Sequence, residues 1–260
     1  MQQMTKYESG TPSWVDLGTS DPTEAVRFYS ELFGWTIAEG PPEAGGYRMC
    51  MLDDQAVAGL GPLMNADMPP SWTTYISVAN ADEIAAAIKD DGGSVLVEPM
   101  DVLDVGRMAV AADPGGAVFS IWQPRAHVGA GRVNDPNTWC WNELTTRDPQ
   151  HSVEFYGAVF GWTANLLPTA GAADYTEFHL GDRGIAGMLP MTGDASPAET
   201  PNQWMVYFAV DDCDAAVAKV EALGGAVMMP PRDVPPGTFA VVKDPQGAVF
   251  SVIAMRPVAA

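Results

Sequence analysis

Residues 14–36 read WVDLGTSDPTEAVRFYSELFGWT, and residues 141–163 read WNELTTRDPQHSVEFYGAVFGWT. The two stretches lie 127 residues apart and are identical at 12 of 23 aligned positions. A period of this length is that of a whole domain rather than that of a solenoid repeat. The chain is therefore predicted to be a fused pair of homologous domains, and any site in one half should have a pseudo-symmetric counterpart in the other.

The similarity continues towards the C-terminal end of each half. Residues Trp72, Tyr75, Val78, Asp82, Gly92 and Gly93 recur as Trp204, Tyr207, Val210, Asp214, Gly224 and Gly225. The segment DPGGAVFS from Asp113 recurs as DPQGAVFS from Asp244. The two halves are thus related along most of their length.

Composition narrows the class of protein. The chain has 260 residues, of which 47% are hydrophobic, enough for two domains with cores of their own. Lys and Arg total 13 against 33 Asp and Glu, a formal charge of −20. This balance argues against partners with a phosphate backbone and against anionic membrane surfaces. The opening MQQMTKYESG lacks the apolar region of a signal peptide, and three cysteines without CxxC spacing indicate a reducing cytoplasm.

The local pattern of each half predicts a strand, a helix and three short strands, followed by the same order again. Asp21 and Asp148 are placed as N-caps of the first helix of each half, and each precedes a proline suited to the first helical turn. Gly34 and Gly161 are placed to end these helices. We therefore predict an α+β fold of four βαβββ modules, which form two tandem domains.

The predicted boundaries follow from these repeats and from the polar segments between them. They are a first domain at 11–124 with modules 14–64 and 72–122, a linker at 125–137, and a second domain at 138–256 with modules 141–191 and 204–254.

Three motifs resemble those of the vicinal oxygen chelate superfamily: the strand and helix ending in FYxxxFGW, the GG after the second helix, and DPxGxxFS before the last strand. This superfamily includes glyoxalase I, bleomycin-resistance proteins, fosfomycin-resistance enzymes and extradiol dioxygenases. The chain looks most like the two-unit glyoxalase-like proteins of actinobacteria. The resemblance implies glyoxalase/bleomycin-resistance-type domains, in which two modules form a curved sheet around a cavity that holds a divalent metal in catalytic members.

The residues at the family's metal-ligand positions are not the usual His, Gln or Glu. Those positions fall on Trp14, Thr73 and Ser120, and near Ala58–Leu60, in the first half; they fall on Trp141, Met205 and Ser251, and near Ala186–Met188, in the second half. Such side chains are poor substitutes for a cage of charged ligands. We therefore expect no metal and no other cofactor, although a divalent metal held by other residues is left open.

Strand alternation suggests which side chains line the cavities. Trp14 and Asp16 share one face of their strand, and Trp141 and Glu143 share the equivalent face in the second half. The alternate residues are mostly apolar and suit packing against helices. Asp16 and Glu143 are therefore predicted to be symmetry-related cavity carboxylates.

In the second half, Tyr175, Glu177 and His179 also share one strand face, whereas their counterparts in the first half are Tyr47 and two methionines. Together with Glu143 they could form an acid/base group or a replacement metal cluster. Alternatively, Glu177 and His179 face solvent at an open sheet edge, which is the interpretation we favour. His127, in the linker, is expected at the surface.

The chain contains eight tryptophans, and aromatic walls can stack on a flat ligand. The candidate ligand-binding residues are Trp14, Asp16, Tyr47, Trp72, Trp122, Trp141, Glu143, Tyr175 and Trp204. The candidate catalytic residues are Asp16, Glu143, Glu177 and His179.

Two functions are compatible with this pattern. The first is metal-independent binding of a small hydrophobic or aromatic metabolite or antibiotic, which the resemblance to bleomycin-resistance proteins implies. The second is an enzyme of the glyoxalase, lyase or dioxygenase type that uses Asp16 or Glu143 as a general base, with or without a non-standard metal. In either case the partner is a small molecule, neither nucleic acid nor membrane, and the chain is a monomer or a homodimer.

Overall fold

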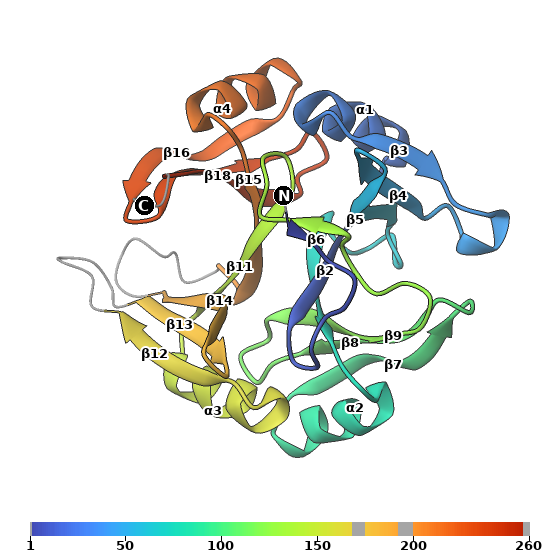
Figure 1. Cartoon of the computed structure of the whole chain (residues 1–260), viewed down its shortest axis with the longest axis vertical. Coiled ribbons are helices and arrows are strands. Elements are labelled where there is room, and N and C mark those ends of the chain that lie inside the picture. The colour runs from blue at the N-terminus through green and yellow to red at the C-terminus, as the bar shows by residue number, and fades with distance from the viewer. Residues whose placement is uncertain (1, 168–174, 192–199, 257–260) are drawn as a thin grey trace.

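The computed structural model describes residues 2–167, 175–191 and 200–256, and within them the chain forms two eight-stranded mixed sheets and four α-helices (Figure 1). The strands of the first sheet are β2 (Pro12–Thr19), β3 (Thr36–Glu39), β4 (Arg48–Leu52), β5 (Gln55–Pro62), β6 (Ser71–Ser77), β7 (Ser94–Val102), β8 (Gly106–Ala112) and β9 (Val118–Pro124). Their order across the sheet is β3-β4-β5-β2-β6-β9-β8-β7.

The second sheet repeats this arrangement. Its strands are β11 (Trp139–Thr146), β12 (Thr163–Leu167), β13 (Tyr175–Leu180), β14 (Arg183–Pro190), β15 (Gln203–Ala209), β16 (Ala226–Val234), β17 (Gly237–Lys243) and β18 (Val249–Met255). Their order is β12-β13-β14-β11-β15-β18-β17-β16. Two short strands, β1 (Gln2–Gln3) and β10 (Arg132–Val133), pair with each other between the N-terminal arm and the linker.

The helices are α1 (Pro22–Phe33), α2 (Ala81–Asp90), α3 (Pro149–Phe160) and α4 (Cys213–Ala222), with a single 3₁₀ turn at Pro42–Ala44. Asp21 caps α1 by accepting from the backbone N–H groups of Thr23 and Glu24, and Gly34 ends α1 in the left-handed conformation. Asp148 caps α3 by accepting from the backbone N–H of His151, and Gly161 ends α3 in the left-handed conformation. No helix in the described ranges is long and apolar enough to cross a membrane.

The predicted α+β class of four βαβββ modules is confirmed. In each sheet the first strands of the two modules lie side by side and antiparallel, β2 beside β6 and β11 beside β15. The last strand of each module pairs in parallel with a first strand, as β5 does with β2 and β9 with β6. The four central strands of each sheet are therefore those that carry the metal-ligand positions implied by the resemblance.

The hydrophobic cores are shared between the halves. Figure 1 shows α1 beside α4 and, at the opposite end of the molecule, α2 beside α3. In the first of these cores the ring of Phe33 lies 5.0 Å from that of Phe208 and 6.2 Å from that of Phe250. The second core joins residues such as Phe119 and Tyr156, whose ring centroids are 5.9 Å apart. Because neither half buries its helices alone, the halves are expected to unfold together.

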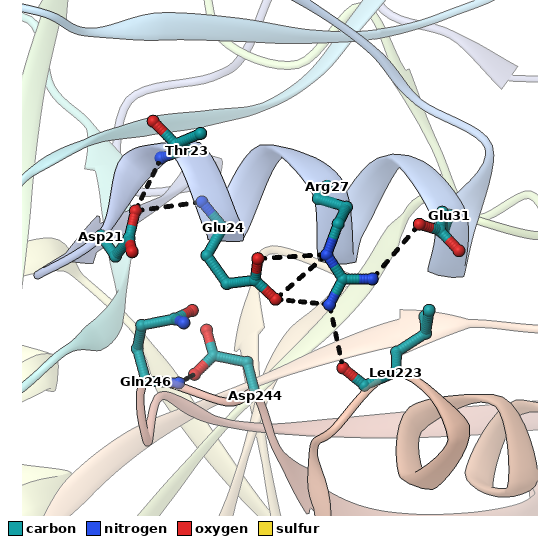
Figure 2. A network of polar contacts seen from close by, with 8 residues as sticks. All are labelled: Asp21, Thr23, Glu24, Arg27, Glu31, Leu223, Asp244 and Gln246. Atoms are coloured by element: carbon teal, nitrogen blue, oxygen red, sulfur yellow. Dashed lines mark hydrogen bonds and ion pairs between the residues drawn. The ribbon is translucent and has the colours of Figure 1, made fainter.

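Hydrogen bonds reinforce both contacts between the halves. The buried Tyr29 hydroxyl donates to Asp244 across 3.0 Å, and its counterpart Tyr156 donates to Asp113 across 3.1 Å. Figure 2 shows the surroundings of the first contact, where Arg27 of α1 donates to the carbonyl of Leu223 after α4. Each half thus contributes an aspartate from its DPxG turn to a tyrosine of the other.

Candidate functional site

The carboxylate of Asp16 lies on the face of the first sheet that is turned away from the helices, which we call the site face. Its Oδ2 accepts hydrogen bonds from the Tyr75 hydroxyl at 2.8 Å and from the Tyr47 hydroxyl at 3.1 Å. The Trp14 indole N–H donates to the same Tyr47 hydroxyl at 2.9 Å. The four side chains come from β2, from β6 and from Tyr47 immediately before β4, and they form one connected polar group.

A glycine allows this arrangement. Gly59 of β5 lies beside Asp16 in the sheet, and a Cβ atom added there would be 1.8 Å from the Tyr47 hydroxyl oxygen. The Tyr47 ring therefore crosses β5 through the space that any other residue would fill. The tyrosine hydroxyl reaches Asp16 because position 59 has no side chain.

The second sheet has an equivalent group around Glu143. The Tyr207 hydroxyl donates to Glu143 Oε1 at 2.8 Å, and the Trp141 indole N–H donates to the Tyr175 hydroxyl at 2.9 Å. A Cβ atom at Gly187 would lie 1.7 Å from that hydroxyl. The two halves thus place the same kinds of group, a carboxylate, two tyrosines, a tryptophan and a glycine, at equivalent positions, as the repeat predicts.

Burial alters the acidity of these groups. It raises the pKa of Asp16 to about 6, an effect that the hydrogen bonds from Tyr75 and Tyr47 only partly offset. Burial likewise raises the pKa of Glu143, against the hydrogen bonds from Tyr207 and Tyr175. A carboxylate with a pKa near neutrality can accept a proton or a strong hydrogen bond from a ligand.

The tryptophans divide between two environments. Trp14, Trp122 and Trp141 lie on the site faces, although Trp14 and Trp122 are also buried, at 3% and 6% exposure. Trp72 and Trp204 do not: each is 6% exposed and packs in a helix-facing core, where Trp72 donates to the Tyr29 hydroxyl and Trp204 to that of Tyr156. The predicted placement of these two indoles in the cavities is therefore wrong.

Glu177 and His179 lie on the site face of β13, the face that they share with Tyr175. His179 Nε2 is 2.9 Å from Glu177 Oε2, and the two side chains are 21% and 29% exposed. The alternate residues Thr176 and Phe178 are buried on the opposite face. Glu177 and His179 are thus bonded to each other and intermediate in exposure, neither buried nor fully open to solvent.

His127 is a residue that sequence reasoning misplaced. Its ring centroid lies 4.5 Å from that of Trp14 and 5.6 Å from that of Trp122, edge-on to both. The Trp122 indole donates to the His127 carbonyl, and burial lowers the pKa of the imidazole to about 4. The linker histidine thus covers part of the first site face as a neutral ring.

The second site face includes an apolar cluster that the sequence did not single out. Met205, Tyr207 and Ile253 form a small buried cluster separate from the main cores. Trp141 and Phe239 pack against it and are half-buried. We call Met205, Tyr207 and Ile253 the apolar floor. Its place beside the Glu143 carboxylate suits a ligand with an aromatic body and a polar group.

The model of the glyoxalase/bleomycin resistance protein/dioxygenase superfamily matches residues 11–121 and again residues 137–252. The chain belongs to this superfamily. A relative from Mycobacterium bovis, named Putative glyoxylase CFP32, is 42% identical over 265 residues, which cover 99% of both chains. Anthracycline biosynthesis protein DnrV of Streptomyces peucetius is 38% identical over 270 residues, which cover 97% of this chain and 96% of that protein.

Solved structures of superfamily members share the fold. The Mn(II)-bound glyoxalase from Novosphingobium aromaticivorans aligns with a TM-score of 0.65 at 17% identity, covering 95% of this chain and 82% of that one. The 2,3-dioxygenase LapB from Pseudomonas sp. KL28 aligns with a TM-score of 0.66 at 12% identity, covering 98% of this chain and 96% of that one.

The residues at the superfamily's metal-ligand positions do not fit a divalent metal. An indole N–H, as at Trp14, offers no lone pair, and the hydroxyls of Thr73 and Ser120 are weak neutral donors. The Trp14 indole is also engaged with Tyr47. In the described ranges no group of three or more His, Cys, Asp or Glu side chains is placed to hold a metal ion.

Replacing Gly59 with alanine should disrupt the first site. The new Cβ atom would displace the Tyr47 hydroxyl from Asp16, at a cost of about 1–3 kcal/mol in the free energy of unfolding. Urea denaturation followed by tryptophan fluorescence measures this cost. Gly18→Ala on β2 is the control, because its Cβ atom would be 3.5 Å from its nearest neighbour. Equal effects of the two substitutions would contradict the assigned role of Gly59.

Proposed function

We propose that the protein binds a small hydroxylated aromatic molecule on its site faces without the help of a metal. The observation that carries this proposal is the pair of carboxylates, Asp16 and Glu143, each of which accepts from tyrosine hydroxyls. Beside each carboxylate a tryptophan, Trp14 or Trp141, stands at a position where the superfamily places a metal ligand. A buried carboxylate accepts strongly from a phenolic hydroxyl, and the aromatic side chains supply contact area for a flat ring.

The relatives support this choice of ligand class. The name of the Streptomyces peucetius relative refers to the biosynthesis of anthracyclines, which are flat, fused-ring molecules bearing phenolic hydroxyl and quinone groups. The apolar floor of Met205, Tyr207 and Ile253 fits the body of such a molecule. The acidic surface of the chain disfavours an anionic ligand.

The test uses anthraflavic acid, a dihydroxyanthraquinone, as the probe. We expect it to quench tryptophan fluorescence saturably, with the same affinity in the presence and absence of a chelator. Native mass spectrometry of protein purified without chelator should show the mass of the bare chain, before and after addition of Zn²⁺ or Mn²⁺. Stoichiometric metal, or binding that a chelator abolishes, would overturn the metal-independent proposal.

The raised pKa of Asp16 favours a second candidate function, proton transfer in an enzyme of the lyase or isomerase type. In such an enzyme Asp16 or Glu143 would take a proton from carbon or oxygen of the substrate. The substitution Glu143→Gln separates the two functions, because an enzyme would lose turnover about 100-fold or more whereas a binding protein would change only in affinity. The assay would use the hemithioacetal of methylglyoxal and glutathione, the substrate type of glyoxalases.

A further inference from the structure

The two site faces differ at one strand. On β13 of the second sheet the residues after Tyr175 on the site face are Glu177 and His179, whereas methionines occupy both positions on β4 of the first sheet. The registers match, because Glu177 lies opposite Gly187 just as Met49 lies opposite Gly59. The difference is therefore one of side-chain chemistry on a common backbone.

A glycine on the neighbouring strand makes room for the Glu177 carboxylate. A Cβ atom at Gly184 would lie 2.3 Å from Glu177 Oε1, so the carboxylate rests where a side chain would otherwise stand. The position corresponding to Gly184 in the first half is Ala56. His179 Nε2 bonds to the other oxygen of Glu177 at 2.9 Å. With Nε2 as the donor of that bond, the Nδ1 atom and Glu177 Oε1 are both acceptors.

The pair lies in line with the Glu143 carboxylate. Glu177, Gly187 and Glu143 are consecutive partners across β13, β14 and β11. Two strand spacings separate the Cα atoms of the glutamates, on the order of 10 Å. Tyr175 lies between them, and the charges of both glutamates raise its pKa in addition to the larger effect of burial. Hydrogen-bond acceptors thus lie on β11, at Glu143, and on β13, at Glu177 and His179, beside the apolar floor of the second site face.

The two site faces also differ in the aromatic side chains that cover them. There the His127 ring lies between Trp14 and Trp122 and covers part of the face. In the second half Ile253 replaces Trp122, and Val258, which lies outside the described residues, replaces His127 in the sequence. The aromatic cover of the first site thus has no sequence counterpart in the second.

We propose that the site face of the second half is the one that selects the ligand, and that the Glu177–His179 pair accepts a hydrogen bond from a phenolic hydroxyl of an aromatic molecule. This inference rests on the proposed function and adds to it the residues that determine specificity. A site built to bond a hydroxyl discriminates strongly against an analogue that lacks it, because its enclosed acceptors are then left unpaired.

The experiment compares anthraflavic acid with unsubstituted anthraquinone as probes of tryptophan quenching. Wild-type protein is expected to bind the hydroxylated probe at least about tenfold more tightly. The double substitution Glu177→Met with His179→Met gives the second half the residues of the first. It should reduce this preference to what Asp16 and Glu143 supply, while leaving the affinity for anthraquinone within about twofold. Met49→Leu with Met51→Leu is the matched control and should keep the preference.

The outcomes separate the two proposals. If wild-type protein binds neither probe, the proposed function fails and this inference fails with it. If both probes bind but the methionine variant keeps the wild-type preference, or the control loses it, only the assignment to Glu177 and His179 is overturned. Circular dichroism and thermal melting establish that each variant is folded, and His179→Gln serves as a milder second variant that should weaken the preference.

Discussion

Asp244→Ala is expected to lower the free energy of unfolding by about 3–5 kcal/mol, because four hydrogen-bond donors lose their acceptor. Asp244 is 2% exposed. Its Oδ1 accepts from the backbone N–H groups of Gln246, Gly247 and Ala248 at 3.0, 2.8 and 2.9 Å. Its Oδ2 accepts from the Tyr29 hydroxyl of the other half. The alanine side chain replaces none of these bonds.

The effect should spread beyond the turn. The Tyr29 hydroxyl also accepts from the Trp72 indole N–H at 3.0 Å, so the loss of Asp244 disturbs a buried chain of hydrogen bonds that joins the halves. Because the aromatic core is shared between the halves, we expect the variant to unfold in one cooperative transition at lower urea concentration.

Asp212→Ala provides the control for this prediction. Asp212 also accepts from a backbone N–H, that of Ala215 at 2.9 Å, but it caps α4 at an exposed position. Its replacement should cost about 1 kcal/mol. Urea denaturation followed by both fluorescence and circular dichroism measures the difference. Equal costs for the two variants, or separate transitions for the two halves, would contradict the role given to Asp244.

The sequence sufficed for features that depend on neighbouring residues. The caps at Asp21 and Asp148 follow from a side chain next to a helix, and the site-face positions of Asp16 and Glu143 follow from simple alternation along a strand. Because the sequence repeats, each feature predicted in one half was also predicted at the equivalent position of the other half. These signals needed no knowledge of which strands pair.

Features that depend on distant contacts were missed. Trp72 and Tyr75 are three residues apart on β6 and so point to opposite faces; Tyr75 faces Asp16, which leaves Trp72 in the core. Strand alternation from Tyr75 thus places Trp72 in the core. No local signal places His127, because its position depends on the linker N–H groups bonding to the carbonyl of Val105.

Asp16→Asn is expected to stabilise the protein at pH 8 while weakening ligand binding. Burial raises the pKa of Asp16 from 3.8 to about 6. The folded state therefore binds this proton more tightly than the unfolded chain does, and stability falls as the pH rises from 4 to 6. Above pH 6 the full cost of holding a charged carboxylate in the site remains. Asparagine is neutral throughout and avoids that cost.

The size of the gain follows from the pKa difference. Each pKa unit corresponds to about 1.4 kcal/mol, and after allowance for the partial exposure of Asp16 we expect a gain of about 2 kcal/mol at pH 8. The gain should vanish near pH 4, where the wild-type carboxyl is largely protonated. Tyr47, immediately before β4, and Tyr75 of β6 face the group. Burial raises the pKa of both hydroxyls, so both remain neutral donors to either side chain over this range.

The measurement is the difference in unfolding free energy between variant and wild type from pH 4 to pH 8. Taking the difference cancels the titration of groups that both proteins share. Asp104→Asn, at an exposed position, is the control and should give a difference close to zero at every pH. A flat profile for Asp16→Asn would contradict the raised pKa. A pH-dependent gain in stability, accompanied by weaker binding of anthraflavic acid, would mean that the protein retains a costly buried carboxylate because its ligand requires one.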